Sequence, residues 1–273
     1  MKCDINSLSG RSVKYVEFPI FKNHCEVTAA FTTRIGGVSR GKYASMNMSF
    51  SNGDEQSAVI ENFKRITDEL QIDYKKLVFS KQTHTVNIKT VTNNDIGKGI
   101  VKPLDYNDVD GLITNIKGVG LVTQFADCVP LLFYDSKNKV IAASHGGWRG
   151  TVGEIARLTI ERMQTDFESN AKDILVAIAP SICMNCYEVD DTVIDRVRQI
   201  DGIDFNMVFT RKISGKYQLN LKELNRQILV LAGVPNENIE ISDWCTNCNS
   251  HIFHSHRATG GNRGNNCAII CLK

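Results

Sequence analysis

The sequence predicts a single-domain α/β fold built on a mixed β-sheet. Apolar residues make up 42% of the 273 residues and charged residues 23%, as expected of a chain that buries one sizeable core. Amphipathic helical segments and short β-branched runs interleave without strict alternation, which favours a mixed sheet over a regular parallel one. No repeat, Pro/Ser-rich linker or low-complexity run divides the chain, so we expect one domain over residues 1–273.

Three segments carry apolar residues at helical spacing. They cover residues 56–71, residues 151–167 and the segment from Leu221 to Leu231, which stops at Gly233. The expected caps are Asp54 or Ser57 for the first helix, a capping box of Thr151 and Glu154 for the second, and Asn220 with Glu223 for the third.

Eight short apolar or β-branched runs lie between these helices and are expected to form strands. They are Val27–Phe31, Leu77–Phe79, Val86–Val91, Gly120–Phe125, Val129–Tyr134, Val140–Ser144, Ile174–Ile178 and Ala268–Leu272.

Two of these strands should form a hairpin that brings a thiol next to an imidazole. The polar segment 135–139 reads as the turn, and if Phe133 faces Val140, the same register places Cys128 opposite His145. A Cys–His pair supports either nucleophilic catalysis by an activated thiolate or metal binding.

A third ligand would favour metal, and His84 offers one. It lies in a polar break between two predicted strands, where side chains project toward a rim. Three protein ligands with an open fourth position is how a catalytic zinc is held.

Four further cysteines form two Cys-x-x-Cys pairs, Cys183 with Cys186 and Cys245 with Cys248. The stretch of 58 residues between Cys186 and Cys245 exceeds the spacing of an ordinary zinc ribbon and contains a predicted helix. We therefore expect buried or incidental thiols, with a structural zinc site and a redox disulfide as the alternatives.

Three of the six histidines lie close together near the C-terminus, at positions 251, 254 and 256. A His-x-His pair suggests copper, but six histidines with one such pair are too few for a multi-copper cluster. The segment reads better as a Gly-rich loop whose arginines, Arg257 and Arg263, bind an anion or shape a pocket. Arg34 lies in a similar Gly-containing loop, and Arg149 lies at the start of the second predicted helix, where an anion would be stabilised.

The charge balance and the N-terminal segment limit the partners and the compartment. The formal net charge is +2, without a polybasic run, so we expect neither nucleic-acid nor membrane binding. The longest weakly charged stretch, residues 118–134, falls short of a spanning helix. Residues 1–7 lack an apolar secretory segment, so we expect a cytoplasmic protein with reduced thiols, Cys3 included.

Taken together, the motifs resemble the YfiH-like family, also called laccase-domain or polyphenol oxidoreductase proteins and described as purine nucleoside phosphorylases. The matching segments run in a shared order: Thr33–Ser39, Asn47, Gly53–Asp54, Gln82–His84, Asp108–Gly111, Ala126–Pro130, His145–Gly150, Cys186–Val189, Cys245–Thr246 and Ser255–Arg257. Two departures are visible. The family's Ser-Tyr-Arg-Arg is here Ser-His-Arg-Ala from Ser255, and its Glu-Asn-Arg is Glu-Asn-Phe from Glu61.

The resemblance implies one α/β domain with central mixed sheets flanked by helices, and a metal site, usually zinc, at His84, Cys128 and His145. It also implies phosphorolysis of adenosine, inosine, guanosine and 5′-methylthioadenosine, and deamination of adenosine to inosine. The substrates would be purine nucleosides and phosphate, and the chain a monomer or homodimer. A set of two imidazoles and one thiolate also accepts copper.

We assign the remaining roles as follows. Cys128 is a catalytic residue as well as a ligand, and Asp127 and Glu188 are candidates for moving protons during deamination. Phosphate or substrate binding is expected from Arg34 first, then Arg149 or Arg257, and from Asn47. The rival functions are a cysteine hydrolase using Cys128 and His145, a copper-dependent polyphenol oxidase of the laccase type, and a non-catalytic metal-stabilised binding module.

Overall fold

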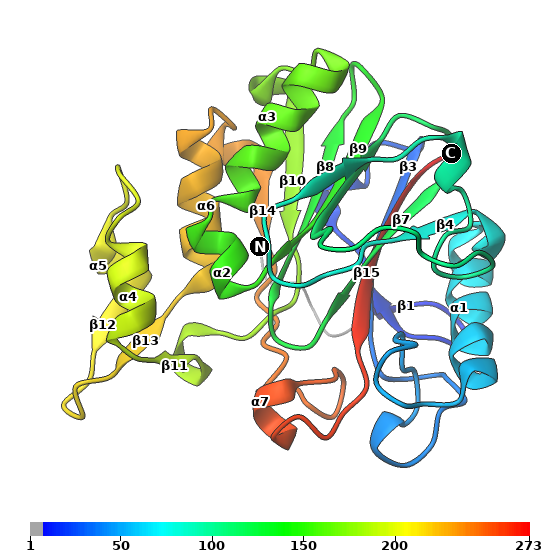
Figure 1. Cartoon of the computed structure of the whole chain (residues 1–273), viewed down its shortest axis with the longest axis horizontal. Coiled ribbons are helices and arrows are strands. Elements are labelled where there is room, and N and C mark those ends of the chain that lie inside the picture. The colour runs from blue at the N-terminus through cyan, green and yellow to red at the C-terminus, as the bar shows by residue number, and fades with distance from the viewer. Residues whose placement is uncertain (1–7) are drawn as a thin grey trace.

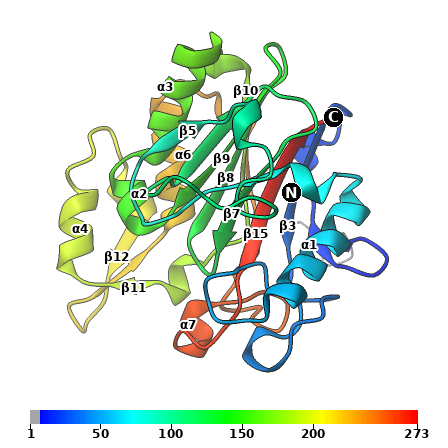
Figure 2. The same ribbon diagram turned by 45° about the vertical axis from the view of Figure 1, so that its right-hand side comes forward.

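The computed structural model describes residues 8–273, so Cys3 and the rest of residues 1–7 lie outside it. Two six-stranded sheets pack face to face, and helices cover both outer faces (Figures 1 and 2). The predicted α/β class with mixed sheets is confirmed. The division of the chain into one domain stays a prediction. No helix among residues 8–273 combines the length and the apolar character needed to cross a membrane.

The strands within residues 8–273 group into three sheets. The first sheet has the order β1 (Leu8–Ser9), β2 (Tyr15–Val16), β3 (Val27–Thr32), β15 (Asn266–Leu272), β7 (Gly120–Phe125) and β4 (Leu77–Phe79). The second has the order β14 (Ile239–Ile241), β10 (Ile174–Ile178), β8 (Val129–Asp135), β9 (Val140–Gly146), β6 (Gly111–Thr114) and β5 (Ile88–Thr90). A small sheet contains β11 (Glu188–Val189), β13 (Tyr217–Leu219) and β12 (Phe209–Arg211).

The helices lie outside the two large sheets or beside the small one. They are α1 (Gln56–Leu70), α2 (Trp148–Val152), α3 (Ile155–Phe167), α4 (Asp191–Val197), α5 (Phe205–Val208), α6 (Leu221–Leu231) and α7 (His256–Thr259). In Figure 1, α1 lies on one side of the sheets and α3 and α6 lie on the other.

Strand β8 shows why the apolar runs in the sequence are continuous. Leu131 and Phe133 pack into the core beneath α3 and α6, whereas Leu132 and Tyr134 pack between the two sheets. Successive side chains of a strand point to opposite faces, so a strand buried on both faces needs apolar residues at every position.

The first and third predicted helices are confirmed as α1 and α6. At α6 the side chain of Asn220 accepts a hydrogen bond from the backbone N–H of Glu223 (3.2 Å), as expected. The cap expected for α1 is wrong: its N-cap residue is Glu55, without a side-chain cap, and Asp54 accepts hydrogen bonds from the Glu55 N–H and the Asn47 side chain instead.

The predicted helix over residues 151–167 is wrong as a single element. The segment contains α2 and α3, separated at Gly153 and Glu154, and Glu154 adopts a left-handed conformation (φ 58°). The capping box is absent, because Thr151 lies inside α2 and its hydroxyl donates to the Gly146 carbonyl (3.3 Å). A side chain at Gly153 would come within 2.6 Å of Val86, so the break lets the chain pass close to that residue.

The predicted hairpin between β8 and β9 is present, but its register is wrong by two residues. Phe133 faces Ala142 rather than Val140, and Val140 faces Asp135. The turn is tighter than expected because the Asp135 carboxylate accepts the backbone N–H groups of Lys137 (2.8 Å) and Asn138 (3.1 Å). A slip of two residues keeps each side chain on its original face.

Candidate metal site and its cavity

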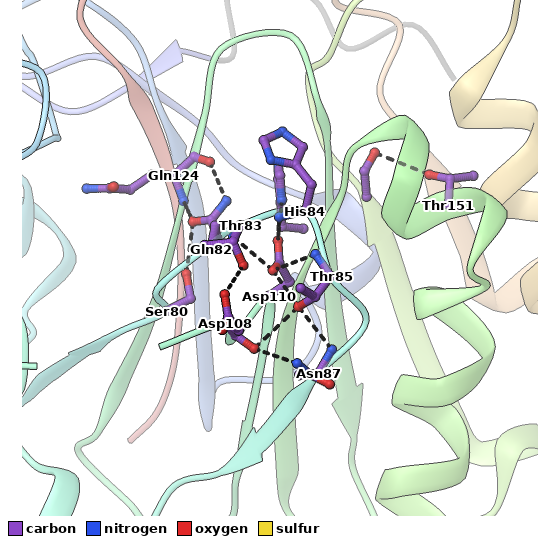
Figure 3. Close-up of polar contacts among 12 residues, drawn as sticks. Ser80, Gln82, Thr83, His84, Thr85, Asn87, Asp108, Asp110, Gln124 and Thr151 are labelled. Carbon is purple, nitrogen blue, oxygen red and sulfur yellow. Dashed lines mark hydrogen bonds and ion pairs between the residues drawn. The ribbon is translucent and has the colours of Figure 1, made fainter. Parts of the chain in front are cut away.

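Asp110 joins the loop that carries His84 to the ring of His145. Its buried carboxylate accepts the backbone N–H groups of Thr83 (3.0 Å), His84 (3.0 Å) and Thr85 (2.9 Å), and the Thr85 hydroxyl (2.9 Å). It also lies 2.8 Å from Nδ1 of His145. Figure 3 shows the 83–85 loop gathered around this carboxylate. These bonds stabilise the left-handed backbone of His84 (φ 66°), a conformation that non-glycine residues rarely adopt.

Gln82 fixes the other side of the same loop to strand β7. Its side-chain oxygen accepts the backbone N–H of Gln124 (2.7 Å), and its side-chain nitrogen donates to the Gln124 carbonyl (2.8 Å). The Ser80 hydroxyl donates to the same Gln82 oxygen (2.9 Å), as Figure 3 also shows. The loop between β4 and β5 is therefore fixed by Gln82 on the side of β7 and by Asp110 on the other side.

The structure brings together the three ligands expected from the sequence. His84 comes from the β4–β5 loop, Cys128 from the β7–β8 turn and His145 from the end of β9. One ligand atom from each lies within 4.8 Å of the others. Because Asp110 holds Nδ1 of His145, Nε2 is the nitrogen of that ring that remains available for a metal.

Gly147 leaves the space that these three side chains occupy. A Cβ atom at this position would lie 2.9 Å from Cδ2 of His84, 3.2 Å from Sγ of Cys128 and 3.4 Å from Cε1 of His145. The glycine therefore lets the backbone at the start of α2 approach the ligand set closely. The donor chemistry and this close packing both fit a metal ion held by two imidazoles and one thiolate.

The ionised forms of Cys128, His145 and Asp110 stabilise one another electrostatically. Burial alone would raise the pKa of Cys128, but His145 and His84 lower it to about 6. Burial would likewise lower the pKa of His145, but the Cys128 thiolate and Asp110 raise it to about 9. The Asp110 carboxyl has a pKa lowered to about 2, because hydrogen bonds from His145, Thr83 and Thr85 outweigh its burial. Without metal, the site thus holds a thiolate beside an imidazolium at neutral pH.

A cavity of about 1130 Å³ adjoins these ligands, and all three line it. It is slightly larger than the usual small-molecule site, which encloses roughly 300–1,000 Å³. Its wall includes several cationic or ionisable side chains: Lys81, Lys102, His256, Arg257 and Arg263. Arg263 is half-buried, and its Nε atom has no hydrogen-bond partner among the described residues. The cavity is therefore suited to an anionic group next to a polar organic molecule.

Three of the residues expected to bind phosphate or substrate lie outside the cavity lining. The Arg34 guanidinium donates to the carbonyls of Ala44 (2.8 Å) and Ser250 (2.9 Å). Asn47 is buried and bonds to neighbouring loop residues, including the Asn265 backbone. Arg149 is exposed and lies over the Trp148 ring at 4.3 Å.

Arg257 does line the cavity, next to Asp127. The Asp127 carboxylate accepts the Arg257 backbone N–H (2.7 Å) and the Thr246 hydroxyl (2.6 Å), so both of its oxygens are engaged. The Arg257 guanidinium donates to the carbonyl of Cys186 (2.8 Å). Glu188 is absent from the residues lining this cavity, and its carboxylate forms ion pairs with Lys212 and Lys216.

Asp110 and Tyr187 are site residues that the sequence reasoning did not single out. Asp110 ends the Asp-Val-Asp segment directly before β6, and the signal that could have found it is its place in the Asp108–Gly111 segment that matches the family. Tyr187 lines the cavity, and burial raises its pKa so that its hydroxyl stays protonated at neutral pH. Arg257 stacks over its ring at 5.5 Å.

The expectation that the two Cys-x-x-Cys pairs are too far apart to meet is wrong. Cys183, Cys186, Cys245 and Cys248 place their sulfur atoms within 4.8 Å of one another. The pairs follow neighbouring parallel strands, which the spacing along the chain did not reveal.

Comparison with known proteins gives consistent results. The model of a family described as multi-copper polyphenol oxidoreductase laccase matches residues 28–273. A Bacillus subtilis protein named purine nucleoside phosphorylase YlmD is 38% identical over 256 residues, covering 92% of this chain and 91% of that protein. A protein named adenosine deaminase RL5, from an unknown prokaryotic organism, is 32% identical and covers 89% of this chain and 94% of its own length. The crystal structure of Bacillus licheniformis hypothetical protein YfiH has a TM-score of 0.91 and 37% identity, covering 97% of this chain and 98% of that one.

Proposed function

This chain belongs to the family described as multi-copper polyphenol oxidoreductase laccase, and from that premise we propose that it is a metal-dependent enzyme acting on purine nucleosides. It cleaves adenosine, inosine, guanosine and 5′-methylthioadenosine with phosphate, and it deaminates adenosine to inosine. The names of the relatives support this class of substrate. The observation that carries the proposal is the convergence of His84, Cys128 and His145 beside a large cavity.

His84, Cys128 and His145 would hold the metal, and zinc is the ion we propose, with copper as the alternative. Bound there, the ion would supply Lewis acidity toward an electronegative atom of the substrate or of water. The task of Asp110 is to orient His145 by accepting its Nδ1 proton and to fix the backbone of His84.

We propose Arg263 and Arg257 as the phosphate-binding residues, in place of Arg34 and Arg149. Both line the cavity, and the unpartnered Nε of Arg263 is the group most in need of an anionic acceptor. In the phosphorolysis step, a phosphate oxygen bonds to the anomeric carbon while the bond from that carbon to the purine nitrogen breaks. The phosphate charge stabilises the positive charge that develops on the sugar.

The leaving purine needs a proton, and Tyr187 is the donor that we propose. It lines the cavity, and a tyrosine hydroxyl carries its proton at neutral pH. We assign Asp127 a positioning role, since its two oxygens hold Thr246 and the backbone of Arg257. Glu188 could transfer protons to the substrate only if the β11–β13 region moved its carboxylate into the cavity, because that carboxylate forms ion pairs with Lys212 and Lys216.

The experiment is incubation of metal-analysed protein with adenosine or inosine, with and without phosphate, followed by chromatography of the bases and nucleosides. The matched variants are Cys128→Ala, which removes a ligand, and Cys25→Ser, which alters an exposed free thiol remote from the ligand set. We expect phosphate-dependent release of the base from wild type and Cys25→Ser only. The proposal fails if neither base nor inosine exceeds the Cys128→Ala background.

A cysteine hydrolase is the second candidate, because the thiolate–imidazolium pair of Cys128 and His145 is also how a nucleophilic cysteine is activated. The two functions respond oppositely to treatment. A metal enzyme loses activity on chelation and regains it with zinc, whereas a cysteine hydrolase keeps its activity in chelator and loses it on thiol alkylation.

A further inference from the structure

Four cysteines outside the His84 site meet at one edge of the second large sheet. Strands β10 and β14 are parallel neighbours, and Val176 pairs with Ile239 and Ile178 with Ile241. Beyond the strand ends, a parallel bridge joins Ser181 and Cys245, one residue out of that register. Both Cys-x-x-Cys pairs follow these strands within a few residues, so two segments far apart in the chain leave the sheet side by side.

The four sulfur atoms are spaced as a metal site requires. All of them lie within 4.8 Å of one another, and those of Cys186 and Cys248 are 3.4 Å apart. Zinc bound by four thiolates has Zn–S distances of about 2.3 Å, which puts the sulfur atoms of a tetrahedron ~3.8 Å apart. The spacing of the cluster is therefore close to that of a tetrathiolate site.

The surroundings of Cys245 suit a negatively charged sulfur. Its Sγ accepts the backbone N–H groups of Cys183 (3.2 Å) and Cys248 (3.4 Å). Such bonds are the means by which a metal-bound thiolate is oriented and its charge stabilised.

A buried ammonium group provides a second, independent observation. Lys222 is 7% exposed, and its Nζ donates to the carbonyls of Ser242 (2.6 Å) and Trp244 (2.8 Å). Burial disfavours the charged form of this amine, and the charges of Cys245, Cys183 and Asp243 act in the opposite direction. Among residues 8–273 no carboxylate lies within ion-pair distance of Nζ, so a negatively charged cluster beside it would stabilise the ammonium group.

We propose that Cys183, Cys186, Cys245 and Cys248 bind a structural zinc ion, separate from the metal held by His84, Cys128 and His145. On binding, four S–H bonds break, four Zn–S bonds form and four protons pass to solvent, with no change of oxidation state. Four protein ligands leave no open position, so this ion is structural rather than catalytic.

The four-cysteine site stabilises one wall of the cavity. Ile182 and Tyr187, which flank the first Cys-x-x-Cys pair, both line the cavity, and the Cys186 carbonyl accepts a hydrogen bond from the Arg257 guanidinium (2.8 Å). The Ile182 N–H donates to the Asp127 carbonyl (3.0 Å), which joins the same segment to the residue before Cys128. Zinc at the cluster thus holds together the loops that shape the substrate side of the cavity.

The test is metal analysis of the full chain purified under reducing conditions and equilibrated with zinc. We expect about two zinc ions per chain in wild type and in Cys25→Ser, and about one in both Cys128→Ala and the double variant Cys186→Ser/Cys248→Ser. Because unfolding of the double variant would also lower its zinc content, cobalt is also loaded into Cys128→Ala. Four thiolate ligands then give intense sulfur-to-cobalt absorption, and reactive thiols increase by four on metal removal.

The proposal is overturned if the Cys128→Ala protein binds no zinc, or if its cobalt spectrum lacks the sulfur charge-transfer bands. It is also overturned if mass spectrometry of the reduced preparation finds a disulfide between Cys186 and Cys248. Failure of purine turnover in the preceding experiment would leave these results unaffected, since none of them measures activity.

Discussion

Replacing Asp110 with Asn tests the orientation of His145. One carboxylate oxygen of Asp110 accepts three bonds, from the backbone N–H groups of Thr83 and Thr85 and from the Thr85 hydroxyl. The other faces the His84 N–H and Nδ1 of His145. An Asn side chain will keep its oxygen toward the three donors, so its NH₂ group turns toward His145.

This exchange reverses the hydrogen bond to the imidazole. Nδ1 of His145 must now accept, so the ring proton moves to Nε2, the nitrogen that faces the other two ligands. Loss of an outer partner of a metal-bound histidine costs about 10- to 100-fold in metal affinity, which is ~1.4–2.7 kcal/mol. The His84 N–H is left facing a donor, and an unsatisfied buried group costs a further ~1–3 kcal/mol of stability.

The assay is competition for zinc against a chromophoric chelator, followed by turnover at saturating zinc and a melting curve. Asp108→Asn is the matched control, because it removes the same charge in the same segment but its exposed side chain bonds only the Thr83 hydroxyl (2.7 Å). Zinc affinity of Asp110→Asn within threefold of that control would refute the reasoning about the tautomer.

Three other predictions concern the same site. Gly147→Ala should lower zinc affinity about tenfold, since its Cβ would press on His84 and Cys128; unchanged chelator competition would contradict this. Arg263→Gln should raise the KM for phosphate about 10- to 100-fold, because loss of a hydrogen bond to a charged group weakens binding by about this factor. If Arg34→Gln raises the KM for phosphate instead, phosphate binding would be assigned to Arg34. Zinc affinity should increase about tenfold per pH unit from 7 to 9 and then level off. The reason is that His145, with its pKa raised to about 9, must lose a proton to bind zinc. A zinc affinity that does not change between pH 7 and 9 would exclude a protonated His145.

The sheets were predictable from the sequence because both large sheets are buried on both faces. Continuous apolar runs such as Leu77–Phe79, Gly120–Phe125 and Ile174–Ile178 give strands with those same bounds. Strand β6 (Gly111–Thr114) was missed, because four residues that begin with glycine carry too little pattern. The helix break coincides with a close approach of Gly153 to Val86, a tertiary feature that helical periodicity does not contain.

The pairing of Cys128 with His145 was expected from a register that the structure corrects by two residues. The two side chains still meet, because a shift of two preserves the face of each strand and both residues lie at the open end of the hairpin. Asp110 could not be assigned in this way. Its role depends on three backbone N–H groups from another loop, which become neighbours only when β5 and β6 pair.

The placement of the histidines bears on the multi-copper chemistry in its family's description. Among residues 8–273, only His84 and His145 belong to groups that could hold a metal; His24 packs against Tyr134, with ring centroids 5.3 Å apart, and His254 is buried. Two imidazoles with a thiolate also form mononuclear blue-copper sites, whose weak axial ligand is a methionine, a glutamine or a backbone oxygen. The cavity lining includes Gln82 and Gln124, and the exposed His84 also lines it. A ligand set that leaves one side facing a large cavity suits an ion that contacts substrate, as the open coordination position of a catalytic metal site does.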